Sequence, residues 1–391
     1  MRLLVGILGL LLVAVVLWEA FETIILPRRV TRVLRVTRLM YFVTWRPWAA
    51  LALAIHSTRR REKLLSFFGP MSLIILLTIW AVGLLVGFAA IHWAAGTHLG
   101  SSELTGFWAD LYFSGSTFFT LGLGDLTPTT NFERAITVAQ AGVGIGFFAM
   151  VISYLPVLYQ AFSRREVNIS MLDARAGTPP TAGELLRRHH EAADLESLNQ
   201  LLKDWEKWSA DLLESHLSYP VLCYFRSQHD NQSWLSALST ILDTCALVMV
   251  GVDGIPKWQA QLTFKMTRHA IVDLTQVFNT SPLTTDGQRL STQELTQLRS
   301  TLAQAGLTLS SEAGDEQTLA ELREMYEPYL VVLSEYLLMP IPGWLPKKRV
   351  VDNWQTSAWE VKAPAREEPF RKCMLEERQQ ARKKAATHSS S

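Results

Sequence analysis

Three long runs of apolar residues dominate the first 165 positions of the chain, at residues 3–26, 71–95 and 135–162. A helix needs about 20 mostly apolar residues to cross a bilayer, and each run meets that length. The first run lies at the N-terminus, where an apolar segment can also be a signal peptide. No small-x-small cleavage site follows it, because it ends in "WEAFETIILPRR". The pattern therefore predicts three transmembrane helices.

The remainder of the chain has the mixed pattern of a soluble helical domain. Apolar positions recur with helical spacing over residues 183–217, 233–250, 256–278, 292–305 and 316–339. Pro220, residues 251–256 and the run "NTSPLTTDGQ" separate these stretches, as turn-forming residues do. No strand alternation is evident, so we expect this part to be all-α. After residue 346 the chain becomes rich in charge, which is typical of a disordered tail.

Basic residues between the apolar runs predict the orientation in the membrane. The loop at 27–66 carries many of them against the single acid Glu62: Arg28, Arg29, Arg32, Arg35, Arg38, Arg46, Arg59, Arg60, Arg61 and Lys63. No Lys or Arg occurs at 95–130, whereas Arg164 and Arg165 follow the third run. Short loops rich in Lys and Arg stay in the cytoplasm. We expect a multi-pass protein of the plasma (inner) membrane, with its N-terminus outside and its C-terminal domain in the cytoplasm.

The basic loop also predicts a partner. Arg32, Arg35 and Arg38 recur every third position with apolar residues between them, which favours an amphipathic helix on the inner membrane surface. Anionic lipid is the expected partner of the basic residues at 28–63. A voltage sensor uses similar spacing, but it requires the arginines to lie in a transmembrane segment. The net charge of +1 gives no support for nucleic acid as a partner, and we expect none.

A shorter apolar stretch, "FWADLYFSGSTFF" at 107–119, lies between the second and third runs. It is too short to span a bilayer and too apolar for a solvated loop, so a re-entrant helix is expected. The residues that follow it are "TLGLGD", positions 120–125. Backbone at membrane depth that is not helical is tolerated where it lines a water-filled path. This stretch is therefore our candidate for an ion pathway.

The glycine spacing has a chemical explanation. Stacked backbone carbonyls, with a threonine hydroxyl at the inner end, can replace the water around a potassium ion. Successive carbonyls point toward one axis only when the backbone dihedrals alternate in hand, and glycine adopts positive φ at no steric cost. Gly122 and Gly124 satisfy this spacing after Thr120. The negative end of the half-helix dipole points toward the ion path, and Asp125 at the outer mouth would concentrate cations.

The stretch "YFSGSTFFTLGLGDLTP" resembles the pore loop of the potassium-channel superfamily, whose filter reads T-V-G-Y-G-D. The resemblance implies a selectivity filter at Thr120, Leu121, Gly122, Leu123 and Gly124, with potassium bound at Thr120–Leu123 and Asp125 at the outer mouth. The outer, pore and inner helices would be 71–95, 107–119 and 135–162. One such loop is one wall of a filter, so the resemblance implies a homotetramer.

The resemblance has three departures. Leu121 replaces the usual valine or isoleucine, and Phe119 stands where a second threonine or serine is usual. Leu123 replaces the tyrosine or phenylalanine that props the filter open. Two-pore-domain potassium channels of animals carry leucine there in some of their pore loops, so the change is compatible with potassium selectivity. We interpret Leu123 as favouring a softer filter, with weaker selectivity or gating at the filter itself.

The third apolar run contains "AGVGIGFFAM", which places Gly142, Gly144 and Gly146 in mid-helix. Small residues of this kind allow close helix packing, which is one explanation. The other follows from the resemblance, which implies a gating hinge glycine about 20 residues after the filter. Pro156 should kink the helix near its inner end. The inner gate is therefore expected at Ser153, Tyr154 and Pro156.

The helical domain contains two polar clusters but no catalytic motif. His189, His190, Glu191 and Asp194 share one helix with Glu214 and His216 further on, yet no Glu-x-x-His pair suggests a metal site. A possible regulatory pocket comprises His216, Tyr219, Arg226, Gln228 and Trp234, with ordinary packing as the alternative. Cys223, Cys245 and Cys373 show no disulfide or zinc spacing. No phosphate-binding loop, dinucleotide fingerprint or nucleophile motif is present, so we expect neither an enzyme nor a cofactor.

The sequence predicts an all-α membrane protein with three transmembrane helices, a re-entrant pore helix and a filter loop, followed by an all-α cytoplasmic domain. The predicted boundaries are a first span (1–26), a basic segment (27–66), a pore domain (67–165), a linker (166–182), a helical domain (183–345) and a tail (346–391). A tetrameric potassium channel, with regulation by the cytoplasmic domain, is the leading hypothesis. The alternatives are a non-selective cation channel and a membrane-anchored sensor with a non-conducting pore-like domain.

Overall fold

The computed structural model describes residues 1–26, 35–96, 106–191, 195–229, 231–252, 256–282, 289–310, 313–346 and 352–353. Across these ranges the chain is helical, and its only β-pairing is an isolated bridge between Val252 and Leu309. The prediction of an all-α protein is confirmed. Arg28, Arg29, Arg32, Glu103, Asp194, Cys373 and nearly all of the predicted tail lie outside the described residues.

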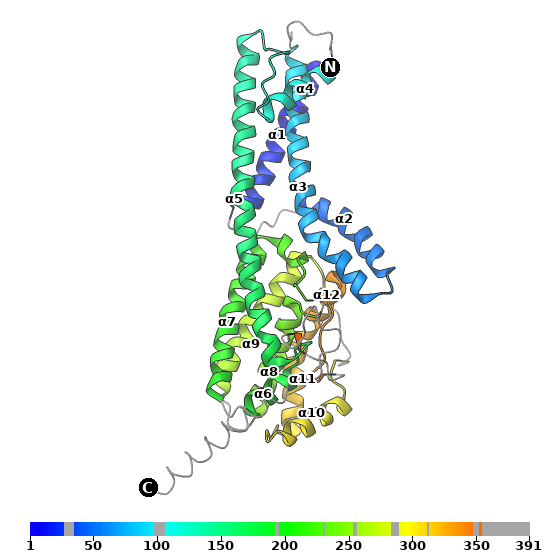
Figure 1. The fold of residues 1–391 in the computed structure, drawn as a ribbon, viewed down its shortest axis with the longest axis vertical. Coiled ribbons are helices and arrows are strands. Elements are labelled where there is room, and N and C mark those ends of the chain that lie inside the picture. Colours follow the sequence, from blue (N-terminus) through cyan, green and yellow to red (C-terminus); the bar gives the residue numbers. More distant parts are fainter. Residues whose placement is uncertain are drawn as a thin grey trace, which may run out of the picture. The chain divides into compact units, whose positions relative to one another are not determined.

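The chain forms two compact units. The first comprises Met1–Phe162 and Ser218–Phe225, and the second comprises Ser163–Leu217 and Arg226–Ser391. The helices of the first unit are α1 (Arg2–Ala20), the π-helix η1 (Phe21–Ile25), α2 (Val36–Leu53), α3 (Thr58–Ala95), α4 (Phe107–Phe118), the first part of α5 (Asn131–Ala176) and the 3-10 helix η2 (Pro220–Tyr224) (Figure 1). The predicted spans and re-entrant helix are thus all helical.

Within the ranges that the structure describes, four helices are long and apolar enough to cross a membrane: Arg2–Ile25, Thr58–Ala95, Asn131–Ala176 and Trp234–Gly251. These helices differ in burial. In Trp234–Gly251, 89% of the 18-residue apolar stretch is enclosed by protein, whereas the corresponding shares in the other three helices are 28%, 39% and 17%. A helix that is apolar all round and enclosed by protein is the core of a domain. Trp234–Gly251 (α8) is such a helix, which leaves the three predicted spans.

The helix α1 packs along α3 through small residues. A Cβ placed on Gly9 would lie 2.6 Å from the carbonyl oxygen of Gly87, so the two backbones touch at this point. Close approach of this kind is a common basis of helix association in membranes. Glu19 at the other end of α1 and Glu22 in η1 are buried, and the Nε atom of Arg35 lies 3.7 Å from a Glu22 carboxylate oxygen. Buried acids at a helix end thus find a basic partner at the start of α2.

Two helices extend beyond the predicted boundaries. Residues 166–176, predicted as linker, continue α5 without a break. Buried positions recur there at helical spacing, at Arg165, Ile169, Leu172 and Ala176, and the turn begins only at Gly177, whose φ is +80°. Similarly, α3 begins at Thr58 and runs through Pro70, where the span was expected to start. Membrane helices tolerate an interior proline where neighbouring groups satisfy the freed backbone.

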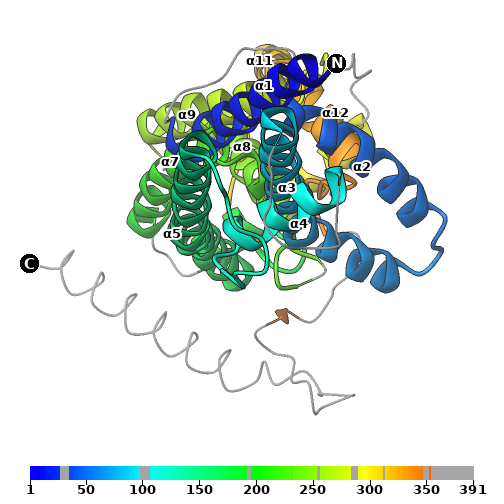
Figure 2. The same cartoon turned by 90° about the horizontal axis from the view of Figure 1, so that it is seen from above.

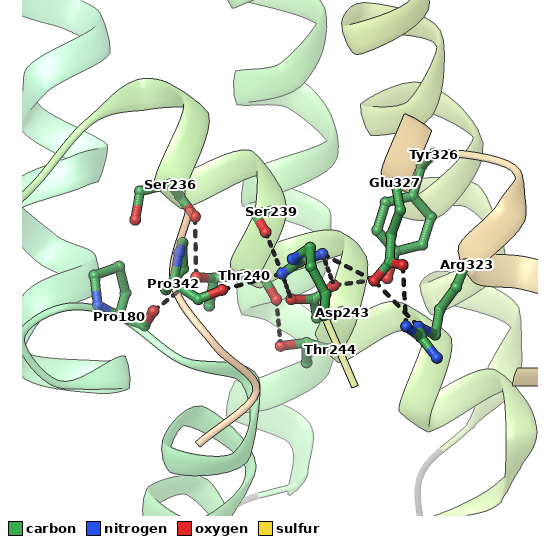
Figure 3. A network of polar contacts seen from close by, with 11 residues as sticks. Pro180, Ser236, Ser239, Thr240, Asp243, Thr244, Arg323, Tyr326, Glu327 and Pro342 are labelled. Atoms are coloured by element: carbon green, nitrogen blue, oxygen red, sulfur yellow. Dashed lines mark hydrogen bonds and ion pairs between the residues drawn. The ribbon is translucent and has the colours of Figure 1, made fainter. Parts of the chain in front are cut away.

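The second unit is a helical bundle around α8. Its other helices are α6 (Ala182–Glu191), α7 (Leu195–Ser218), α9 (Lys257–Val277), α10 (Thr292–Gln304), α11 (Ala313–Glu324) and α12 (Glu327–Leu337), together with the end of α5 (Figure 2). Figure 3 shows Asp243 of α8 pointing toward Tyr326 and Glu327. The Arg289 guanidinium lies 2.7 Å from Asp243 and 3.1 Å from Glu327, and Arg323 lies 3.1 Å from Glu327, so two cations balance the two buried acids.

Candidate ion-conduction site

The re-entrant helix α4 begins after Gly106 and ends at Phe118, close to the predicted bounds. One face is buried against the first unit through Phe113, Ser114 and Phe118, and α4 lies against α3 in both views (Figures 1 and 2). A helix of 12 residues is about 18 Å long, which is roughly half of a bilayer. The helix is therefore too short to span a bilayer, and a turn at membrane depth stays a prediction.

The backbone after α4 has the alternation that the glycine spacing predicts. φ is +56° at Thr120, +60° at Gly122 and +80° at Gly124, while Leu121 and Leu123 between them keep negative φ. Positive φ is rare for a β-branched residue such as Thr120, and such outliers gather at functional sites. The turn is held by the amide of Leu121, which donates to the Ser116 carbonyl at 2.8 Å. Consecutive residues of this segment thus alternate in the sign of φ.

The side chains of the segment have few neighbours within one chain. Leu121 is 60% exposed and Leu123 is 63% exposed, although both are apolar. At its C-terminal end the segment is attached to α4 in two ways. The Tyr112 hydroxyl is hydrogen-bonded to Asp125, and Leu126 packs into a small cluster with Ala109 and Phe113. The C-terminal end of the loop is fixed while its apolar middle is uncovered.

The three glycines of α5 differ in their surroundings. A Cβ on Gly144 would lie 2.5 Å from the carbonyl oxygen of Phe118, the last residue of α4. Nothing lies within 4 Å of a Cβ placed on Gly142 or Gly146. Gly144 thus permits α5 to touch the end of the re-entrant helix, which is the packing explanation. The hinge roles of these glycines and of Pro156, which lies inside an unbroken α5, stay predictions.

Residues 73–160, which contain α4, the loop and most of both flanking spans, match the family model described as "Ion channel". This segment is similar to the ion-channel family. The match confirms the resemblance inferred from "TLGLGD" and points to transport rather than catalysis. The curated "Uncharacterized membrane protein YdjJ" of Bacillus subtilis (strain 168) is 26% identical over 195 residues, 49% of this chain. The match covers 56% of that protein, so this chain spans about half of its length. No solved structure matches the chain significantly.

Of the five residues of the predicted regulatory pocket, His216 and Trp234 pack together, while Tyr219, Arg226 and Gln228 have other surroundings. His216 is buried beside Arg165 and packs on Trp234, with ring centroids 5.6 Å apart. Arg226 donates to the carbonyls of Leu337 and Leu338, and Gln228 is exposed. Tyr219 belongs to the first unit, called the channel unit from here on, where it packs on Tyr154, the candidate gate residue. Packing and hydrogen bonding explain these contacts, and a ligand there stays a prediction.

Among the residues that the structure describes, no three His, Cys, Asp or Glu side chains gather to hold a metal ion.

The sequence analysis did not select His92, Ser114 or Gln140, which are fully buried in the channel segment. Gln140 is hydrogen-bonded to both His92 and Ser114. A polar residue inside an apolar run is the signal that marks such groups.

Proposed function

We propose that the protein is a potassium-selective channel that conducts passively through Thr120–Gly124, with potassium as the permeant ion and no cofactor. The observation that carries the proposal is the positive φ at Thr120, Gly122 and Gly124 in alternation with the leucines between them. Such a backbone directs successive carbonyl oxygens toward one line, where they can replace the hydration shell of potassium. Asp125, at the outer end, would concentrate cations there.

The proposal requires four copies of the chain, because one loop is one wall of a filter. Two features support a homotetramer. The first is the exposure of Leu121 and Leu123 in the single chain. The second is the low burial of the inner helix α5, because only 17% of its 18-residue apolar stretch is buried. Val138, Ile145 and Ile152 recur every seven residues along its uncovered face, and they are 73%, 59% and 71% exposed. Neighbouring copies and the conduction path would cover this face.

The proposed orientation has the N-terminus outside and the helical domain inside, in the plasma membrane. The basic residues of α2 and early α3 support it, since Arg38, Arg46, Arg59 and Arg60 are exposed. On α2 these arginines alternate with exposed apolar residues, Leu39, Phe42 and Val43. A helix with exposed apolar and basic side chains suits the surface of an anionic membrane, so we retain anionic lipid as the proposed partner.

The helical domain is proposed to regulate the pore through Ser218–Phe225. This segment belongs to the channel unit, although Leu217 and Arg226 on either side belong to the second unit. Tyr224 stacks on Tyr41 of α2, with centroids 5.1 Å apart and rings 3° from parallel, and contacts Phe68 of α3. Phe225 packs on Phe162 of α5. If a change in the second unit displaced this segment, the packing of α2, α3 and α5 against it would change.

A non-selective cation channel is the second candidate, favoured by Leu123. Its side chain is exposed where the channel superfamily carries an aromatic ring. The Na⁺/K⁺ permeability ratio of the wild type and of Leu123→Tyr separates the two candidates. A stricter preference for potassium in the variant is expected if leucine softens the filter. Equal ratios in the two proteins would remove that interpretation.

The deciding experiment is ion flux from liposomes that contain the purified protein, measured separately in K⁺ and in Na⁺. Flux that is faster in K⁺ and is abolished by Gly122→Ala or Gly124→Ala is expected. An added Cβ meets no atom within 4 Å at either position, so the loss would come from backbone conformation and not from a clash. Absence of flux under varied pH, tension and voltage would favour a sensor with a non-conducting pore-like domain.

A further inference from the structure

A continuous path of buried hydrogen bonds joins the three helices around the proposed filter. His92 of α3, Ser114 of α4 and Gln140 of α5 are each 0% exposed. The His92 Nε2 and Gln140 Oε1 atoms are 3.0 Å apart. The Gln140 amide nitrogen lies 2.6 Å from the Ser114 hydroxyl and 2.9 Å from the Ser114 carbonyl oxygen. The Ser114 hydroxyl in turn donates to the Leu85 carbonyl of α3 at 2.8 Å.

The direction of each bond follows from the chemistry of its groups. Gln140 Oε1 has no hydrogen, so His92 Nε2 must donate to it. The Gln140 amide nitrogen donates both to the Ser114 hydroxyl and to its carbonyl, and that hydroxyl passes its own hydrogen to Leu85. The path therefore starts and ends on α3 and crosses α4 and α5. The ring of Phe113 packs edge-on to His92, with centroids 5.2 Å apart, and limits rotation of the imidazole.

This path fixes the helix from which the filter emerges. Ser114 lies one turn before the end of α4, and Ser116, two residues on, accepts the amide hydrogen of Leu121. One turn further along α4, Gly144 of α5 touches the Phe118 carbonyl. The same inner helix thus holds α4 at Ser114 through Gln140 and at Phe118 through Gly144. A small rotation of α4 would move both the Ser116 carbonyl and the first residues of the filter.

We propose that Gln140, oriented by His92, is a positioning residue that fixes the proposed filter at the width suited to potassium. The inference rests on the proposed function. It assigns to this path a role in ion preference, and not in folding alone. Removing the Gln140 amide takes the acceptor from the His92 Nε2 hydrogen and one donor from the Ser114 hydroxyl and carbonyl, and losing a partner at a buried site favours a shift toward other contacts. The helix α4, free to rotate, would then hold the carbonyls of the filter at less uniform distances from the ion.

The test compares K⁺ and Na⁺ flux in liposomes for variants that assemble as the wild type does. Gln140→Leu removes the amide, and His92→Phe keeps a ring of similar shape but removes the donor. His92→Gln replaces the imidazole by a chain that ends in an N–H donor and serves as the rescue. Thr137→Val is the matched control, because the Thr137 hydroxyl donates to the Glu133 carbonyl within α5. Should Gln140→Leu not assemble, Ser114→Ala removes a single hydroxyl from the same path.

The K⁺/Na⁺ permeability ratio is expected to fall about tenfold in Gln140→Leu and His92→Phe, given the usual effect of an unpaired buried group. It should return toward the wild-type value in His92→Gln and stay unchanged in Thr137→Val. A merely structural role would reduce the amount of assembled protein and leave the ratio of the remainder unchanged, and that result would overturn the inference alone. Absence of flux in the wild type would instead overturn the proposed function, and the inference with it.

Discussion

At the scale of single residues, Gly144 is explained by packing and can be tested against its neighbours. Gly144→Ala places a methyl group 2.5 Å from the Phe118 carbonyl, so α5 and α4 must separate. Overpacking of this kind costs about 1–3 kcal/mol. We expect Gly144→Ala to lower the melting temperature of the purified protein. Gly142→Ala and Gly146→Ala, where nothing lies within 4 Å, are the controls and should be neutral or stabilising. Loss of stability in the controls alone would contradict the packing explanation.

A second residue, His216, should make the helical domain sensitive to acid. Burial, reinforced by the adjacent Arg165 guanidinium, holds the pKa of His216 well below its usual value of 6.5. The folded state keeps the imidazole neutral while the unfolded chain protonates below about pH 6.5. The unfolded state therefore binds more protons, and stability is lost as the pH falls through that value, by at most about 1.4 kcal/mol per unit.

Replacing the histidine tests this prediction. His216→Gln keeps an acceptor for Arg165, which lies 3.2 Å from Nε2, but cannot titrate. Denaturant unfolding of the full chain between pH 7 and pH 5 should then depend less on pH than in the wild type. His229→Gln, at an exposed histidine, is the control and should leave the dependence unchanged. An unchanged dependence in His216→Gln would show that other groups cause the acid sensitivity.

The proposed filter and the network behind it differ in how far they were predictable. Two glycines at the right spacing predict the positive φ of Gly122 and Gly124, whereas positive φ at the β-branched Thr120 is rare and was not predicted. Gln140 meets Ser114 across 26 positions and His92 across 48 positions. No spacing rule connects positions so far apart. Only the packing of α3, α4 and α5 brings these residues together.

At the scale of elements, hydropathy located the membrane helices but not their full lengths. The apolar runs mark the parts of α3 and α5 that suit a bilayer, whereas these helices are 38 and 46 residues long. Their polar continuations have no apolar run to reveal them. The sequence analysis also did not assign the segment Ser218–Phe225 to the channel unit. Its apolar stretch "PVLCYF" resembles part of a soluble core, yet it packs within the channel unit.

That segment leads to a prediction about coupling. Tyr224→Ala removes a buried ring that contacts Tyr41, Trp45 and Phe68, and losses of this size cost about 3–5 kcal/mol. We expect a lower melting temperature and a changed rate of K⁺ flux, with an unaltered K⁺/Na⁺ ratio, since the filter is built by other elements. Tyr224→Phe keeps the stacked ring and should behave as the wild type. Assembled Tyr224→Ala with wild-type flux would show that this contact does not couple to conduction.

At the scale of the whole molecule, assembly and ion binding should be linked. The proposed filter exists only where four loops meet, so potassium bound there stabilises the tetramer and not the separate chains. We expect native mass measurement to give four copies of the 44.0 kDa chain, and heat to dissociate them at a higher temperature in K⁺ than in Na⁺. Gly122→Ala should assemble but lose this preference, because its added Cβ disfavours the positive φ that the carbonyl direction requires. A dimer, or a tetramer that is equally stable in both ions, would contradict the link between the loop and the assembly.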